Sequence, residues 1–189
     1  MLLSKPELVK LAVEVAHEYN LDPALVCAHI DIRSQWNSGF SLPTAVSYLV
    51  HQNFPDPMEC EWRSVQWGLM GILGEFARNE GYQGKLSELL APDRNLQEGC
   101  RILKRLMGSD PDYQKAAVEA LVKWNRESSQ NFAALVLSKL EAYRVLLVRI
   151  PDQQQTFQCD DTIHPQERLQ IEGNLLLEVG ASTHTQSLP

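Results

Sequence analysis

The chain has no long apolar run. No stretch approaches the roughly 18 consecutive apolar residues that a membrane-spanning helix needs, and Lys5, Glu7 and Lys10 interrupt the first ten residues. A secretory signal peptide has an unbroken apolar core, so we expect no signal peptide and no insertion into a membrane.

Cysteines are few, and none of them lies in a Cys-x-x-Cys pair. They stand at Cys27, Cys60, Cys100 and Cys159. This spacing argues against a zinc site and a thioredoxin-like motif, and it predicts buried free thiols instead. No cluster of His, Asp or Glu has the spacing of metal ligands either. We therefore expect no metal and no other cofactor.

Positive charge is also scarce. The 189 residues include 17 Lys and Arg against 24 Asp and Glu, which gives a net charge of −7 at pH 7. This balance disfavours binding to nucleic acid or to an anionic cell wall. Residues 151–189 hold six acidic residues and one arginine, so this segment carries five of the seven net negative charges.

The composition is otherwise that of a globular protein, with 44% hydrophobic and 22% charged residues. We predict one domain over residues 1–150 and an acidic, Gln-rich extension over 151–189, with a helix only near 165–177. Such an extension is at best partly ordered in isolation. We therefore expect partner subunits of a larger assembly to hold it.

Helical signals dominate residues 1–150. Ser4 and Glu7 form a capping box around Pro6, which starts a helix that runs to about Tyr19, and Asp22 with Pro23 starts a second helix that runs into 34–36. Further helices are predicted over 41–54, 67–79, 85–90, 96–107, 111–124 and 131–149, with a loop over 59–65. No segment shows sustained period-two alternation, so we expect an all-α fold without a substantial sheet.

Three segments carry a family resemblance when taken in order. They are Asn20–Asn37, Ser64–Gly74 with its Trp-Gly-Leu-Met run, and Leu121–Asn125 with its Trp-Asn pair. Together they resemble the soluble lytic transglycosylases and goose-type lysozymes, particularly the versions from phages and bacteria. The resemblance covers about Leu8 to Tyr143 and implies a lysozyme-like helical domain.

One position departs from the family in its chemistry. In that family a glutamate protonates the glycosidic oxygen and then acts as a base, which requires a group that exchanges a proton near neutral pH. In this sequence the matching position is Arg33. A guanidinium group stays protonated and cannot do this work.

Other family positions divide into retained and altered ones. The retained ones, which would support the architecture of the cleft, are Ser34, Asn37, Trp67, Gly68, Met70 and Asn125. The altered ones are Gly71, where the family has a sugar-contacting Gln, and Arg126 and Glu127, where it has paired glycines. The residues expected at a substrate cleft, called the cleft residues below, are Ser34, Asn37, Trp67, Met70, Gly71, Trp124 and Asn125. A domain that has lost its activity but kept its fold is expected to show this division between retained scaffold positions and altered chemical positions.

Several side chains leave other interpretations of the missing acid open. Glu59 and Glu61 precede the second segment and are weak substitutes for the acid, whereas Asp31 projects about 200° away from Arg33 around the helix. His29 is expected to be packed rather than to act as a base. An ion pair from Arg33 to Glu61 or Glu127 also stays open. So does the stacking of tryptophan rings on sugars, for which the candidates are Trp36, Trp62, Trp67 and Trp124.

The sequence thus favours a catalytically inactive transglycosylase-like domain that serves as a structural component of an assembly, most readily a phage tail or baseplate. A phage-encoded chain would then lie in the virion, and any other in the cytoplasm. Two alternatives are an active peptidoglycan-cleaving enzyme with a relocated acid and a non-catalytic peptidoglycan-binding module.

Overall fold

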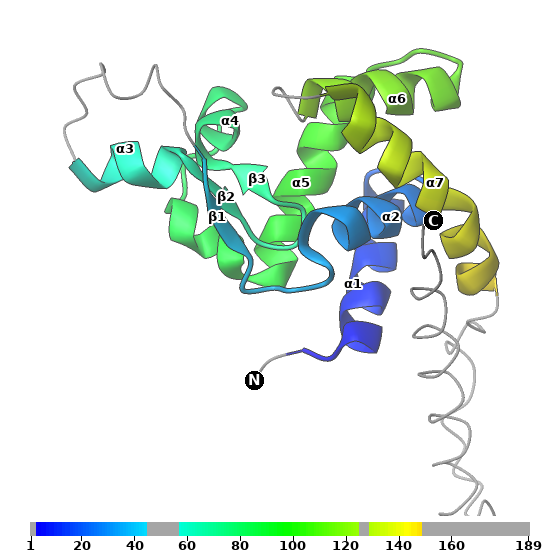
Figure 1. Ribbon diagram of the computed structural model, residues 1–189, viewed down its shortest axis with the longest axis horizontal. Helices are drawn as coiled ribbons and strands as arrows, with labels where there is room; N and C mark the ends of the chain where they lie inside the picture. The colour runs from blue at the N-terminus through cyan, green and yellow to red at the C-terminus, as the bar shows by residue number, and fades with distance from the viewer. Residues whose placement is uncertain (1–2, 45–56, 125–128, 149–189) are drawn as a thin grey trace, which may run out of the picture. The chain divides into compact units, whose positions relative to one another are not determined.

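The computed structural model describes residues 3–44, 57–124 and 129–148, and these ranges are mostly helical (Figure 1). The helices are α1 (Lys5–Glu18), α2 (Pro23–Ser34), α3 (Pro57–Arg63), α4 (Gly74–Asn79), α5 (Pro92–Met107), α6 (Tyr113–Trp124), α7 (Ser129–Val148) and the 3-10 helix η2 (Leu86–Leu90). The mainly helical class predicted from the sequence is confirmed. The predicted extension, residues 151–189, lies outside the described residues. In the described ranges, no helix has both the length and the apolar character that crossing a membrane requires.

The first two helices begin at their predicted caps. The backbone N–H of Ser4 donates to Oε2 of Glu7 at 2.7 Å, and Asp22 accepts a hydrogen bond from the backbone N–H of Ala24 at 2.9 Å. Each contact satisfies a donor that the first turn of a helix leaves without an intrahelical partner. The sequence signals therefore place both helix starts correctly.

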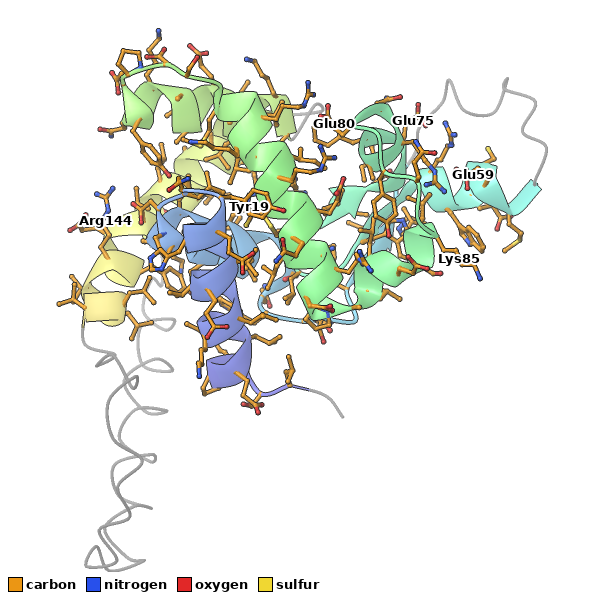
Figure 2. The ribbon with its side chains drawn as sticks, turned by 180° about the vertical axis from the view of Figure 1, so that it is seen from behind. Tyr19, Glu59, Glu75, Glu80, Lys85 and Arg144 are labelled. Carbon is orange, nitrogen blue, oxygen red and sulfur yellow. The ribbon has the colours of Figure 1, made fainter. Side chains whose placement is uncertain are left out.

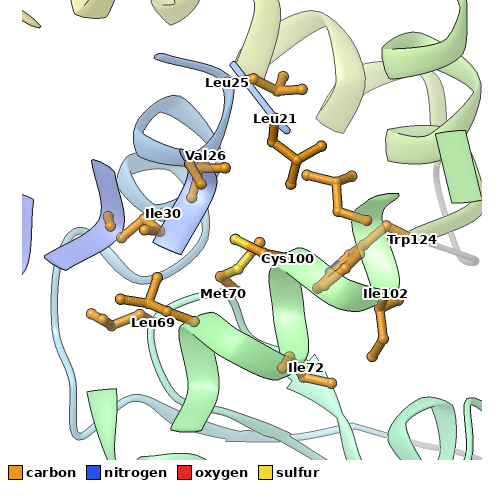
Figure 3. Packing of buried hydrophobic residues seen from close by; sticks show 14 of the residues in the cluster. Leu21, Leu25, Val26, Ile30, Leu69, Met70, Ile72, Cys100, Ile102 and Trp124 are labelled. Atoms are coloured by element: carbon orange, nitrogen blue, oxygen red, sulfur yellow. The ribbon is translucent and has the colours of Figure 1, made fainter. Parts of the chain in front are cut away.

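The core surrounds α2, which packs chiefly against α7 and α1. Figure 3 shows Leu25 and Ile30 of α2 among side chains of other segments, including Cys100 of α5. Cys27 and Cys100 are buried thiols, as predicted, whereas Cys60 is only partly buried, so the prediction is wrong for that residue, and Cys159 lies outside the described residues. Burial raises the pKa of the Cys27 and Cys100 thiols to about 12, so both stay protonated and unreactive at neutral pH.

The helix predicted over residues 67–79 is wrong for its first half. Residues Val65–Trp67 form strand β2 and Ile72–Leu73 form strand β3, and only from Gly74 onward is the segment helical. Gly68 and Gly71 have φ values of +65° and +56°, which lie in the left-handed region. Glycine adopts this conformation without steric cost, so these two residues reverse the chain where a helix would have continued.

Two further predictions next to this turn are corrected. Ser41–Pro43, expected to begin a helix, is strand β1, and it pairs with β2 in an antiparallel register that places Leu42 opposite Gln66. Residues 45–56 of that predicted helix lie outside the described residues. Part of the predicted loop over 59–65 is helical, since α3 extends to Arg63. The result is a small sheet in the order β1-β2-β3.

Candidate functional site

Arg33 lies in the last turn of α2, directly before the helix ends. Gln35 and Trp36 both have positive φ, 52° and 65°, so the chain turns sharply after Ser34. Arg33 donates from one guanidinium nitrogen to Oε1 of Gln66 on β2 at 3.2 Å. Its guanidinium carbon lies 4.3 Å from the centre of the Phe132 ring on α7. A strand and two helices therefore hold this side chain.

Gly71 lies under the stem of Arg33. A Cβ atom built on Gly71 would come within 2.4 Å of Cγ and 2.5 Å of Cδ of Arg33, far closer than two carbon atoms can approach. Positions 33 and 71, two of those at which the sequence departs from the resembled family, are thus in contact. Arg33 occupies the space that a side chain at position 71 would need.

The surroundings of Arg33 are partly apolar, and this affects the pKa of its guanidinium group. Burial lowers the pKa of the Arg33 guanidinium to about 10. The group is still protonated at neutral pH, and the face of the Phe132 ring favours that cation. Arg33 therefore presents a fixed positive charge at the position where the resembled enzymes have an acid.

His29, one turn before Arg33, is packed as predicted. Its ring is 0% exposed and meets Trp124 and Phe132 edge-on, with ring centres 4.8 and 5.3 Å away. Nε2 lies 3.0 Å from the carbonyl oxygen of Met70, and Nδ1 has no hydrogen-bond partner among the described residues. Burial, reinforced by the charge of Arg33, lowers the pKa of His29 to about 3.

This buried imidazole predicts sensitivity to acid. In the unfolded chain His29 takes up a proton below about pH 6.5, whereas in the folded chain it does so only near pH 3. The free energy of unfolding is therefore highest above pH 6.5 and decreases as the pH falls from there. We expect this difference in the protonation of His29 to lower the free energy of unfolding by about 2 kcal/mol between pH 7 and pH 5. Urea unfolding of wild type and His29→Gln at both pH values measures this difference.

The exposed His17 on α1 provides the matched control. His17→Gln should keep the wild-type dependence on pH, because the side chain at position 17 is exposed and folding does not transfer it from water into the core. An equal dependence on pH in wild type and His29→Gln would contradict a buried neutral imidazole at position 29.

Most of the retained cleft residues support the scaffold. Ser34 donates to the carbonyl oxygen of Ile30 at 3.2 Å, and Asn37 accepts from the backbone N–H of Gly39 at 3.0 Å within the turn after α2. Met70 is fully buried, and Trp67 and Trp124 are only 7% and 6% exposed. Asn125, Arg126 and Glu127 lie outside the described residues. The structure therefore brings Arg33, Gly71 and Gln66 together, and it places Met70, Trp67 and Trp124 in the core around them.

Glu59, one of the two weak substitutes for the acid, lies on α3 (Figure 2). Two arginines hold its carboxylate. Its Oε1 accepts from Nε of Arg63 at 2.9 Å and from Nε of Arg78 at 2.7 Å. The hydrogen bond from Arg78, followed by that from Arg63, lowers the pKa of Glu59 below its ordinary value. A general acid needs the opposite shift. Glu61, the other substitute, is exposed on the same helix.

Asp31, which helix geometry predicts to lie on a different face of α2 from Arg33, has a partner of its own. Its carboxylate pairs with Nζ of Lys139 on α7 at 3.6 Å. Nearby, Nε1 of Trp36 donates to the hydroxyl oxygen of Tyr143 at 2.9 Å. These contacts join α2 and the turn that follows it to α7, so Asp31 belongs to the helix packing and not to the Arg33 site.

Asn95 is an important residue to which the sequence reasoning assigned no role. It is fully buried on α5, accepts from the backbone N–H of Met70 at 2.8 Å, and donates to the carbonyl oxygens of Trp67 and Leu89 at 2.8 and 2.9 Å. It thereby ties the turn between β2 and β3 to α5. A signal was present, because Asn95 lies in register with the apolar face of its helix.

Among the described residues, no three side chains of His, Cys, Asp or Glu come together as a metal site. Comparisons of the chain with protein-family models, with curated proteins and with solved structures found no match. The motifs of the sequence and the geometry around Arg33 are therefore the features of this chain that point to a function.

Proposed function

We propose that residues 1–150 form a lysozyme-like domain of the lytic transglycosylase type that has no catalytic activity and serves as a structural component of a larger assembly. A phage tail or baseplate is the setting that the resemblance implies. The observation that carries the proposal is Arg33 at the acid position, seated on Gly71 and held by Gln66 and Phe132.

The charge of Arg33 opposes glycosidic cleavage in two ways. Its guanidinium group cannot deliver a proton to the leaving oxygen at neutral pH. The transition state of glycosidic cleavage also has oxocarbenium character, so positive charge develops on the sugar ring. A fixed cation at this position would destabilise that state, whereas a carboxylate would stabilise it.

The packing around Arg33 supports an adapted site rather than an isolated substitution. Gly71 leaves the room that the arginine stem needs, and Gln66 supplies a neutral acceptor for the guanidinium group. These partners come from the strand and turn that would form one wall of a substrate cleft in the resembled enzymes. The site is therefore organised around arginine.

Both alternative functions have less support. The lowered pKa of Glu59 disfavours an enzyme with a relocated acid, since that carboxylate is stabilised in its ionised form. Burial of Trp67 and Trp124 disfavours a glycan-binding module, because their rings have little surface left for stacking on sugars.

Turnover of purified peptidoglycan tests the proposal. We expect no soluble muropeptides, and none with anhydro ends, from wild type or from Arg33→Gln, which removes the cation without adding an acid. Arg33→Glu restores the acid and should produce slight but detectable release. Release by wild type would overturn the proposal, and Glu59→Gln and Glu61→Gln would then locate the acid.

Sedimentation with insoluble peptidoglycan separates the structural role from a binding role. A wild-type chain that stays in the supernatant agrees with a structural component. A chain that pellets with peptidoglycan, and no longer does so after Trp62→Ala, would instead favour the glycan-binding module.

A further inference from the structure

His29 lies where α2 meets α7, and its ring is enclosed by three other segments. The rings of Trp124 on α6 and Phe132 on α7 meet it edge-on. Its Nε2 lies 3.0 Å from the carbonyl oxygen of Met70, in the turn between β2 and β3. A carbonyl oxygen can only accept, so Nε2 carries the proton of the neutral ring. Nδ1 is therefore the nitrogen that would take up a second proton.

That second proton would have no acceptor in the folded domain. Nδ1 is buried and has no hydrogen-bond partner among the described residues. The described groups that face the ring are the Arg33 guanidinium group, the Met70 carbonyl and the two aromatic rings, and none of them is an anion. Protonation of His29 would thus bury an unpaired N–H and a second positive charge beside Arg33, which is costly.

The ion pairs that join α7 to α2 also depend on acidic groups. Oδ2 of Asp31 lies 3.6 Å from Nζ of Lys139, and Oδ2 of Asp22 lies 3.1 Å from a guanidinium nitrogen of Arg144. The lysine and arginine side chains are about half exposed, so each pair contributes little stability even when it is charged. Protonation of either aspartate would remove its pair. Acid therefore weakens the contact between α2 and α7 at these two pairs as well as at His29.

The other surroundings of His29 are held independently of α7. Asn95 ties the turn between β2 and β3 to α5 through three buried hydrogen bonds. By contrast, α7 packs chiefly against α2 and α6 (Figure 1). On its outward side Leu135 and Val145 are 52% and 48% exposed. The described residues thus hold α7 from one side, and its release would leave the packing of α5 and of the sheet intact.

We propose that α7 is an acid-sensitive helix: proton uptake by His29 releases residues 129–148 from α2, while α5 and the turn bound to Asn95 stay folded. Release gives water access to the new N–H of His29. It also separates the Phe132 ring from Arg33, so the guanidinium group becomes more exposed. Because the released state binds the proton more tightly, its population rises as the pH falls.

Hydrogen exchange of backbone amides tests the proposal at pH 7 and pH 5, measured by NMR on the wild-type full chain and corrected for the intrinsic exchange rate. We expect the protection of Val136 and Tyr143 in α7 to fall about 25-fold from pH 7 to pH 5. This factor follows from a pKa of 6.5 for His29 in water and of about 3 in the core. At pH 5 these two amides should be at least about tenfold less protected than those of Ile102 and Leu103 in α5.

His29→Gln is the matched variant, since glutamine keeps a polar side chain but takes up no proton. The fall in α7 protection should shrink to less than about threefold in this variant. His17→Gln, at an exposed position on α1, should keep the full fall.

Three results would each overturn the proposal. Equal protection of α7 and α5 at pH 5 would mean that only the whole domain unfolds. Unchanged protection of α7 in wild type, or a full fall in a folded His29→Gln, would mean that the histidine does not control the helix. The comparison of α7 with α5 needs no variant, so it decides the matter even if His29→Gln does not fold.

Discussion

Replacing Asn95 with alanine is expected to lower the free energy of unfolding by about 3–5 kcal/mol. The substitution removes the partners of one buried N–H and two buried carbonyl groups, those of Met70, Trp67 and Leu89. Each buried polar group left unpaired costs about 1–3 kcal/mol, and the truncated side chain leaves a cavity in addition. The turn that carries Gly71 would lose its attachment to α5.

Chemical unfolding of wild type and Asn95→Ala, followed by circular dichroism, measures this loss. Asn79→Ala, at an exposed position at the end of α4, is the control and should stay within about 0.5 kcal/mol of wild type. Asn95→Asp keeps the acceptor for Met70 but loses both donated hydrogen bonds, so it should also destabilise strongly. A loss below about 1 kcal/mol for Asn95→Ala would mean that these three contacts do not hold the turn.

The helix starts could be predicted because their determinants are local. Ser4 with Glu7 and Asp22 with Pro23 act within one turn, so the sequence alone contains the whole interaction. The long helices α5, α6 and α7 were predictable for a similar reason, since their apolar spacing repeats over three turns or more.

The segment from α3 to α4 could not be predicted in this way. Its strands are two and three residues long, too short for a period-two signal, and Leu69, Leu73 and Phe76 happen to have helical spacing. The helix α3 depends in part on Glu59, which binds Arg63 four residues on and also Arg78 of α4. Contacts between segments therefore override the local pattern here.

The candidate site was predictable only in part. The motif around residues 20–37 identified Arg33 as the altered position, and its permanent charge followed from its chemistry. Its neighbours Gln66, Gly71 and Phe132 come from three other parts of the chain. The tertiary fold brings these residues together. The sequence therefore showed the departures at positions 33 and 71 separately, whereas in the structure they form one interlocked pair.

This interlock predicts a strong coupling between positions 71 and 33. Gly71→Gln places a Cβ atom 2.4 Å from Cγ of Arg33 and also forces a side chain onto a residue with φ of +56°. We expect a loss of about 3 kcal/mol or more in the wild-type background. In the Arg33→Ala background the steric part should disappear and only the backbone strain should remain, about 1 kcal/mol.

A double-mutant cycle on unfolding free energies measures that coupling, which we expect to be about 2 kcal/mol. Gly81→Ala is the matched control, since Gly81 also has a positive φ, +90°, but a Cβ there meets nothing within 4 Å. It should show the strain alone, with no coupling to Arg33→Ala. Additive effects of Gly71→Gln and Arg33→Ala, within about 0.5 kcal/mol, would show that the arginine stem does not lie on Gly71. A coupled result would mean that Cγ and Cδ of Arg33 exclude a larger side chain at position 71.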